Sequence, residues 1–302
     1  MNASPTGAET PTVAFLGTGI MGSAMAVNAA RAGLRVRAWS RPLADAERLA
    51  PEGIEVRPTA AAAVDGADLV LTVVPDAAAV ETFAEGPDGF LDALGPEAIW
   101  IQSSTVGVAP ADRLIELATA HGATIVDAPL LGSREPAERA ELIMLASGEE
   151  SAIDRCEPLF TTISRRTVRL GRAGNGSRMK MVTNGWIMSS VAGVAEAMAL
   201  AKGLGLDGSG FLEAITGTGF DMGYAQTKGR MMLSGEYPAQ MRLANGAKDA
   251  RLAAAAHHEA GLQGRLVGAA AALMERGCEL GHVDEDMAAA FFAALEPGRP
   301  AS

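Results

Sequence analysis

Apolar and polar positions follow two different periods in the first part of this 302-residue chain. From residue 12 to about 170, short apolar runs rich in β-branched residues alternate with segments of helical periodicity, the order that parallel strands with crossover helices require. The predicted strands are 12–17, 34–39, 68–74, 98–102, 123–127, 141–146 and 166–170. The predicted helices are 20–32, 42–50, 59–65, 76–84, 107–121 and 149–161.

After residue 173 the strand-like alternation stops, and helical patterns joined by Gly-rich connections replace it. The predicted helices here are 175–203, 207–216, 240–260, 263–277 and 284–294. We therefore predict an α/β fold, in which a Rossmann-type doubly wound sheet over 12–173 precedes an all-helical domain over 174–302. Residues 1–11 lack a basic start and an apolar core, so we interpret them as a disordered leader rather than a signal peptide.

Composition narrows the classes of function. A net charge of −11 without a long basic face argues against nucleic acid as a partner. Cys156 and Cys278 lie far apart and in no metal-type spacing, which favours a reducing compartment and no metal site. The stretch 181–201 is long enough to span a bilayer, but it contains Asn184 and several hydroxyl side chains, so we predict a buried helix instead. We expect a cytoplasmic protein with a small-molecule substrate and no membrane partner.

The first predicted strand leads directly into a Gly-x-Gly-x-x-Gly turn. Gly17 permits the sharp turn, Gly19 lets backbone N–H groups approach a pyrophosphate, and Gly22 lets the following helix pack close to the strand. The positive end of that helix also favours phosphate. The predicted cofactor-binding residues of the turn are Gly17, Thr18, Gly19, Ile20, Met21 and Gly22.

The end of the second predicted strand indicates which dinucleotide is bound. An acidic residue at this place accepts from the ribose 2′-OH of NAD, whereas this chain has Ser40 and Arg41. A serine hydroxyl and a guanidinium both donate to phosphate. The sequence therefore favours NADP(H), with NAD(H) less favoured. The alternative is that Arg41 is an ordinary solvated loop residue.

Five segments resemble, in chain order, motifs of the β-hydroxyacid dehydrogenase family. This family includes 3-hydroxyisobutyrate dehydrogenase, glyoxylate and succinic semialdehyde reductases and, more distantly, 6-phosphogluconate dehydrogenase and imine reductases. The segments are Gly17–Ala26, Ser103–Thr105, Asp127–Ser133, Gly174–Asn184 and, more weakly, Lys248–Ala253. The tail Ser133–Glu138 is most similar to the glyoxylate and succinic semialdehyde reductase branch. The resemblance implies an NAD(P)-dependent oxidoreductase acting on CH–OH groups.

The fourth segment contains the residues that the resemblance implies for catalysis. Lys180 and Asn184 are four positions apart, so on a helix they lie on one face. In the family the matching lysine donates a proton to the substrate carbonyl oxygen as hydride is transferred, and the matching asparagine holds the substrate. An ammonium suits this role because it stabilises a developing alkoxide. We expect the glycines before Lys180 to let the cofactor approach closely. By itself, a lysine near a helix start is usually a solvated surface residue.

Further residues are assigned to the site by the same resemblance. Ser104 and Thr105 orient substrate and nicotinamide, or else cap the helix predicted at 107–121. Val74 and Pro75 line the nicotinamide pocket, although Pro75 can equally just end its strand. Lys248 reaches the cofactor or the substrate, while its neighbour Asp249 forms an ion pair or a cap.

The sequence departs from the family at positions that face the substrate. Leu131 stands where the family has a serine that helps to bind a carboxylate. Either Ser133 and the backbone around Gly132 replace that serine, or the substrate lacks a carboxylate there. Met241 stands where an aromatic residue is common, and Gln102 replaces a common strand-end acid. These changes predict a more apolar and adaptable substrate pocket.

The leading hypothesis is an NADPH-dependent reductase of a small aldehyde or keto acid, reversible to hydroxy acid oxidation. An imine reductase is the alternative, although such enzymes generally have Asp or Tyr where Lys180 stands. A non-catalytic NADP-binding protein is the third. The helix predicted at 175–203 is apolar around much of its surface, so we expect a homodimer or a dimer of dimers.

Overall fold

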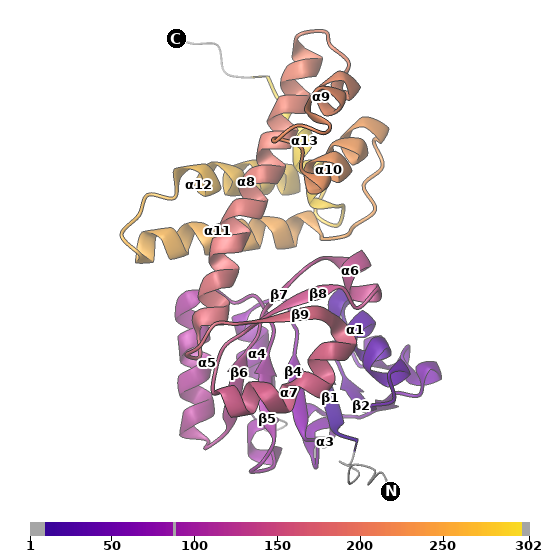
Figure 1. The fold of residues 1–302 in the computed structure, drawn as a ribbon, viewed down its shortest axis with the longest axis vertical. Coiled ribbons are helices and arrows are strands. Elements are labelled where there is room, and N and C mark those ends of the chain that lie inside the picture. The colour runs from indigo at the N-terminus through magenta and orange to yellow at the C-terminus, as the bar shows by residue number, and fades with distance from the viewer. Residues whose placement is uncertain (1–9, 87–88, 298–302) are drawn as a thin grey trace, which may run out of the picture. The chain divides into compact units, whose positions relative to one another are not determined.

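The computed structural model describes residues 10–86 and 89–297. By their contacts these residues form two compact units, one ending at Lys180 and the other beginning at Met181 (Figure 1). The segment expected to be a disordered leader lies outside the described residues up to residue 9. The expected domain limits, 12–173 and 174–302, stay predictions.

The first unit contains a six-stranded parallel sheet in the order β3-β2-β1-β4-β5-β6. Because β1 pairs with both β2 and β4, the strand order reverses at β1, and ligands of doubly wound sheets bind at such a point. The predicted fold class is confirmed. The strands are β1 (Thr12–Leu16), β2 (Arg35–Trp39), β3 (Glu55–Val56), β4 (Leu69–Thr72), β5 (Ile99–Gln102) and β6 (Thr124–Asp127).

Helices cover both faces of this sheet, as Figure 1 shows. Successive strand side chains point to opposite faces. Val13 and Phe15 of β1 accordingly join one buried cluster, while Ala14 and Leu16 join another. The helices of the unit are α1 (Ile20–Arg31), α2 (Ala44–Glu47), α3 (Ala60–Val64), α4 (Ala77–Ala84), α5 (Val108–Ala120), α6 (Arg134–Glu138) and α7 (Glu150–Ile163), with short 3₁₀ turns at Ala50–Glu52 and Leu91–Ala93.

The helix predicted at 42–50 is wrong in extent. The structure has the short α2 and then a separate 3₁₀ turn that contains Pro51 near its start. Proline lacks an N–H and so does not continue a helix that precedes it, which explains the break.

Two predicted strands do not join the main sheet. The chain forms a second sheet from β7 (Leu130–Leu131), β8 (Leu142–Ala146) and β9 (Ser164–Arg169). Strand β7 runs antiparallel to β8, and β9 runs parallel to it. The strands predicted at 141–146 and 166–170 therefore exist but extend this smaller sheet, because the main sheet ends at β6. Strand β7 is too short to give a sequence pattern.

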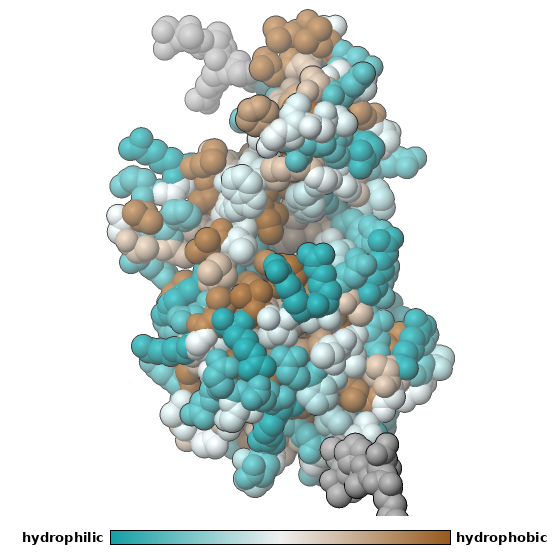
Figure 2. Space-filling model, in the orientation of Figure 1, coloured by the Kyte–Doolittle hydropathy of each residue, from teal (hydrophilic) through white to brown (hydrophobic). Residues whose placement is uncertain are grey.

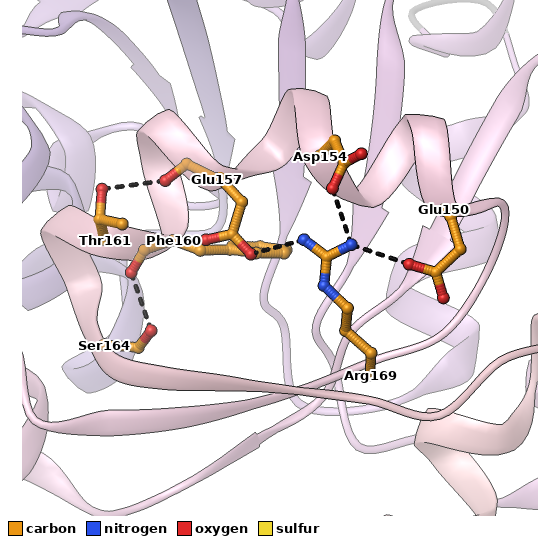
Figure 3. Close-up of polar contacts among 7 residues, drawn as sticks. All are labelled: Glu150, Asp154, Glu157, Phe160, Thr161, Ser164 and Arg169. Atoms are coloured by element: carbon orange, nitrogen blue, oxygen red, sulfur yellow. Dashed lines mark hydrogen bonds and ion pairs between the residues drawn. The ribbon is translucent and has the colours of Figure 1, made fainter.

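An exposed ion-pair network joins α7 to β9 (Figure 3). The Arg169 guanidinium contacts Glu150 at 2.8 Å, Asp154 at 2.7 Å and Glu157 at 3.1 Å. These carboxylates lie on one face of α7, and their hydrogen bonds raise the pKa of Arg169. Exposed pairs of this kind stabilise a fold only weakly. The network fixes the outer face of α7 and forms no part of the candidate site.

Helix α8 (Asn175–Gly203) begins in the first unit and continues into the second, which is helical throughout its described part. The buried core of the second unit includes Met188, Leu243 and Met274. Its other helices are α9 (Gly208–Ile215), α10 (Gly223–Ser234), α11 (Leu243–Glu259), α12 (Arg265–Glu279), a 3₁₀ turn at Met287–Ala289 and α13 (Ala290–Ala294).

Helix α10 was not predicted, and α11 begins later than the predicted residue 240. Both differences involve a buried ion pair. Lys228 of α10 is 1% exposed and contacts Asp286 at 2.6 Å. The same carboxylate accepts hydrogen bonds from the backbone N–H groups of Gln240 and Met241, which keeps these residues out of α11. Burial lowers the pKa of Lys228, an effect that the Asp286 charge opposes.

Figure 2 shows apolar surface among polar side chains. The exposed apolar residues of the second unit include two on α8, Val182 and Trp186, each 66% exposed. The prediction that 181–201 is a buried helix is therefore wrong in part. Across residues 10–86 and 89–297, no helix is long and apolar enough to cross a membrane.

Candidate active site

The turn between β1 and α1 contains two glycines that the protein itself requires and one that faces open space. A Cβ at Gly17, where φ is +104°, would lie 2.4 Å from the carbonyl oxygen of Val73. A Cβ at Gly22 would lie 2.0 Å from the carbonyl oxygen of Gly17. A Cβ at Gly19 would meet no described atom within 4 Å. Gly19 therefore leaves room for a ligand at the start of α1.

Polar groups beside this turn have unused hydrogen-bonding capacity. Ile20 and Met21 open α1, so their N–H groups have no acceptor within the helix. The Thr18 hydroxyl is buried and finds no hydrogen-bond partner among the described residues. The Ser40 hydroxyl, also buried, accepts a bond from the Thr18 N–H at 3.3 Å and still has its own hydrogen to donate. An unpartnered buried hydroxyl is costly, so these residues fit a ligand with polar oxygens.

A cavity of about 460 Å³ lies next to the residues that follow β2. Trp39, Arg41 and Phe83 line it, together with the carboxylates of Glu81 and Glu85. The Arg41 guanidinium lies 5.9 Å from the Trp39 ring centre and 5.4 Å from that of Phe83. Such contacts hold an exposed cation against an aromatic surface. The cavity thus combines aromatic walls with a cation and two acidic residues; the aromatic walls suit a nucleobase, and Arg41 is the group that can bind a phosphate.

The ends of β4 and β5 are joined by buried polar side chains. The Ser104 hydroxyl accepts a hydrogen bond from the Val74 N–H at 2.9 Å. The Gln102 side-chain amide holds the Ser104 backbone on both sides, accepting from its N–H at 2.7 Å and donating to its carbonyl at 3.0 Å. Gln102 and Ser104 are each only 1% exposed. Where the family often has an acid, this chain has a neutral amide that both donates and accepts.

These bonds bear on the predicted roles of the segment. Ser104 holds Val74, which was predicted to line the nicotinamide pocket with the exposed Pro75. The capping role suggested for Ser104 and Thr105 is wrong, because the N-cap of α5 is Gly107, with φ of +91° and no side-chain cap bond. The roles of Ser104 and the half-buried Thr105 toward substrate stay predictions.

The glycines at the start of α8 pack closely against other protein atoms. A Cβ at Gly176 would lie 2.3 Å from the carbonyl oxygen of Leu145 and 2.7 Å from that of Asp127. A Cβ at Gly174 would lie 2.6 Å from the Arg178 guanidinium. The Cβ positions of both glycines thus point at the protein's own atoms, and close approach of the cofactor to this segment stays a prediction. The glycines let the first turn of α8 pack against the protein's own backbone.

Lys180 lies one helical turn further along α8. It is 8% exposed, and its ammonium donates a hydrogen bond to the Leu130 carbonyl oxygen at 2.8 Å. It is therefore not the solvated surface lysine that its position alone would suggest. The neighbouring Leu131 is partly exposed, and Gly132 adopts a φ of +132°. Ser133 precedes α6, and its hydroxyl does not cap that helix.

The remaining predicted residues lie in the second unit. Asn184 is 1% exposed, and its side-chain nitrogen donates to Asp249 Oδ2 at 2.9 Å. The Lys248 ammonium lies 2.9 Å from Asp249 Oδ1, in an ion pair without the angles of a hydrogen bond. The ion-pair role suggested for Asp249 is thus observed, and it orients the Asn184 amide. Met241 is half-buried against the core of this unit.

Two family models together match nearly the whole chain. The model of the NAD-binding domain of 6-phosphogluconate dehydrogenase matches residues 12–171. A second model, described as the NAD-binding domain of NADP-dependent 3-hydroxyisobutyrate dehydrogenase, matches residues 174–293. The chain belongs to the β-hydroxyacid dehydrogenase family. As a member of this family, the chain is an NAD(P)-dependent oxidoreductase that acts on CH–OH groups. It binds a nicotinamide dinucleotide. The open space at Gly19 and the unpartnered Thr18 hydroxyl fit such a ligand.

Similar proteins in this family are named for different activities. Glyoxylate/succinic semialdehyde reductase 1 of Arabidopsis thaliana is 29% identical over 92% of this chain and 96% of its own length. The 3-hydroxyisobutyrate dehydrogenase of Mycobacterium tuberculosis, solved with L-serine, is 29% identical, with a TM-score of 0.85 over 95% of this chain and 100% of that chain.

Other similar proteins show how widely the fold is used. Human cytokine-like nuclear factor N-PAC is 27% identical over 96% of this chain, which spans 53% of that protein. An imine reductase from Myxococcus stipitatus in complex with NADP⁺ is 18% identical, covering 95% of this chain and 100% of its own, with a TM-score of 0.66. At that identity the likeness concerns the fold alone.

Some residues around the site escaped the sequence reasoning. The sequence predicts no role for Asp127, although it lies within a family motif, and none for Ser147. Both bind the first turn of α8, as described below. The sequence does contain one indication of this role: Asp127 follows an apolar run, and a buried carboxylate there needs hydrogen-bond donors. The donors come from residues distant in sequence, which no local pattern identifies.

Proposed function

We propose that this β-hydroxyacid dehydrogenase reduces a small aldehyde or keto acid with NADPH and that Lys180 is the proton donor. The observation that carries the proposal is the buried Lys180 ammonium, held 2.8 Å from the Leu130 carbonyl oxygen. A lysine removed from water and aimed by a backbone contact is suited to polarise a substrate carbonyl. The reverse reaction, oxidation of the hydroxy acid, uses the same groups.

The reaction places one demand on each group. When bound, NADPH would be the source of the hydride that the carbonyl carbon gains. The Lys180 ammonium stabilises the negative charge that grows on the carbonyl oxygen and transfers a proton to it, so that the alcohol forms. The neutral amine then regains a proton from solvent. An ammonium has three donors, which lets Lys180 contact Leu130 and a substrate oxygen in the same orientation.

Preference for the phosphorylated cofactor is supported by the residues after β2. Arg41 lies on an aromatic wall of the cavity, and no acidic residue stands at the strand end where NAD enzymes use one. The Ser40 hydroxyl retains a hydrogen that can be donated to phosphate. We propose NADP(H) as the working cofactor, with Arg41 on the 2′-phosphate.

The substrate pocket supports a second candidate function. Leu131 and Met241 are apolar where the family often has a serine and an aromatic residue, which would suit an uncharged imine. Lys180 argues against an imine reductase, because that group generally has Asp or Tyr at this position. For a carboxylate substrate, Ser133 is the remaining hydroxyl near Leu131, and it does not cap the helix that follows it.

Loss of NADPH absorbance with a panel of acceptors tests the proposal. The panel is glyoxylate, succinic semialdehyde, methylglyoxal and a cyclic imine. We expect turnover with at least one aldehyde. Turnover of the imine alone would assign the second function, and NADPH binding without turnover of any acceptor would identify a non-catalytic protein.

We also propose that the chain forms a dimer through α8. Val182 and Trp186 lie one turn apart on this helix, and each is 66% exposed. Large apolar side chains left in water at this spacing favour burial against a second copy. Sedimentation at micromolar concentration should give a dimer or a dimer of dimers, and Trp186→Glu should shift it toward monomer. A monomeric wild-type protein would refute the proposal.

A further inference from the structure

The first turn of α8 is held by the ends of two strands from different sheets. Asp127 ends β6, and Ser147 directly follows β8. The two residues exchange backbone hydrogen bonds, Asp127 N–H to the Ser147 carbonyl at 2.9 Å and the reverse at 2.8 Å. Their side chains point to the helix start, where N–H groups lack acceptors within the helix.

The Asp127 carboxyl group is almost fully buried, 2% exposed, and receives donors on both oxygens. Oδ1 accepts from the Ser177 hydroxyl at 2.7 Å. Oδ2 accepts from the Ser177 N–H at 2.8 Å and from the Ser147 hydroxyl at 3.1 Å. The Ser147 oxygen accepts in turn from the Gly176 N–H at 2.8 Å. Two successive backbone N–H groups of α8 are thus tied to the strand ends.

Close backbone packing removes the remaining freedom of this turn. With a Cβ position only 2.3 Å from the Leu145 carbonyl oxygen, Gly176 has no space to move inward. These hydrogen bonds and this close packing together hold the helix start against the strand ends. Lys180 follows Ser177 by three positions, less than one turn, so the orientation of this turn sets where the ammonium lies.

We infer that Asp127 is a positioning residue, which holds the first turn of α8 so that the Lys180 ammonium is placed for proton transfer. This inference rests on the proposed role of Lys180. Capping alone would not require Asp127, because an N-cap residue of α8 itself could accept hydrogen bonds from the same N–H groups. The placement of Lys180 gives the buried Asp127 carboxyl group a further role. Misplacement of a catalytic group by about 1 Å can cost about 100-fold in rate.

A surface contact on the same turn provides a matched control. Arg178 pairs with both carboxylate oxygens of Asp112 at 2.9 and 2.8 Å. These side chains are 44% and 43% exposed, so solvent screens this pair and its contribution to stability is small. It tethers the same helical turn without entering the buried cluster.

The test compares three variants, Asp127→Ala, Asp127→Asn and Asp112→Asn. For each we would measure kcat, the KM for NADPH and the deuterium isotope effect with NADPH labelled at the transferred hydrogen. Rates are expressed per NADPH-binding site, which removes any loss of folded protein. Asp127→Ala should lower kcat about 10- to 100-fold with an unchanged KM for NADPH and a larger isotope effect. Asp127→Asn should recover most of kcat, because the amide still accepts from the Ser177 N–H and can donate to its hydroxyl. Asp112→Asn should resemble the wild type.

Ser177→Ala keeps the carboxyl group and removes one donor, so it serves if Asp127→Ala does not fold. It should lower kcat by a smaller factor in the same direction. Unchanged kcat per site in whichever of Asp127→Ala and Ser177→Ala folds, or an equal loss in Asp112→Asn, would overturn the inference. Full activity of Lys180→Ala would instead overturn the proposed function, so the two failures are distinguishable.

Discussion

Helix α1 and helix α8 both begin after glycine-rich segments of the first unit. At α1, Gly17 and Gly22 serve the turn itself, while a side chain at Gly19 would enter open space. At α8, side chains at Gly174 and Gly176 would collide with protein atoms. The second helix start gives its N–H groups to Asp127 and Ser147, whereas the first leaves open space beside Gly19, where we propose that the cofactor binds. A glycine-rich helix start indicates that either a ligand or another part of the protein lies close to its backbone. Only the packing around the glycines shows which of the two it is.

The largest effect is expected from adding a methyl group at the start of α8. Gly176→Ala places a Cβ against two backbone oxygens that have little freedom to move. Overpacking of this kind costs about 3 kcal/mol. Urea denaturation should show the loss as a lower midpoint with an unchanged slope. A stability equal to that of the wild type would remove the distinction between the two helix starts.

The same substitution at α1 should leave the fold nearly intact and damage binding. Gly19→Ala has space for its Cβ, and the backbone of Gly19, with φ of −69°, suits alanine. Stability should change by less than about 1 kcal/mol. NADPH affinity, measured by fluorescence titration, should fall about tenfold or more, which corresponds to about 1.4 kcal/mol. Unchanged affinity would show that Gly19 does not face the cofactor.

The next prediction concerns Arg41, which we propose binds the 2′-phosphate of the cofactor. Arg41→Ala removes a charged donor to phosphate, and hydrogen bonds to charged groups contribute about 1.5–3 kcal/mol. NADPH should bind about 10- to 100-fold more weakly, while NADH affinity should stay unchanged. Arg35→Ala, at the opposite end of β2, is the matched control and should alter neither. Equal affinities of the wild type for the two cofactors would contradict the assignment.

The smallest effect concerns how the stability contributed by Asp127, at the start of α8, depends on pH. Burial raises the pKa of Asp127 above 3.8, although hydrogen bonds from Ser177 and Ser147 and the charge of Arg178 oppose this. A raised pKa in the folded state contributes stability that is present below the unfolded pKa and is lost as pH rises through the folded pKa. The unfolding free energy of the wild type minus that of Asp127→Asn should therefore decline from about pH 4 toward neutrality. A difference that grows with pH would reverse the assigned cause.

Much of the fold followed from periodicity and punctuation in the sequence. The five longer strands of the main sheet, the turn at Gly17 and the start of α8 near Gly174 all carry strong local signals. The placement of β8 and β9 in a separate sheet does not, because strand pairing depends on contacts between distant segments. The unpredicted α10 has the same cause, since it is held in part by the buried pair between Lys228 and Asp286.

The site divides in a similar way. The sequence could name Lys180 because a family motif surrounds it, and the buried location of its side chain is consistent with that role. It could not show that Gly176 and Ser177 bind the ends of β6 and β8, since those partners lie far away along the chain. It also suggested a capping role for Ser104, whereas the structure uses that hydroxyl to hold Val74. Residue type was predictable, but the choice of partner was not.

The most direct test of the account is the rate of aldehyde reduction by Lys180→Ala in the presence of saturating NADPH. Lys202→Ala is the matched control, because Lys202 is an exposed lysine in the last turn of the same helix. Lys180→Ala should bind NADPH normally and lose about 100- to 10,000-fold in kcat, whereas Lys202→Ala should keep its rate. Substantial turnover by a folded, NADPH-bound Lys180→Ala protein would contradict the claim that the helix start at α8 exists to place this proton donor.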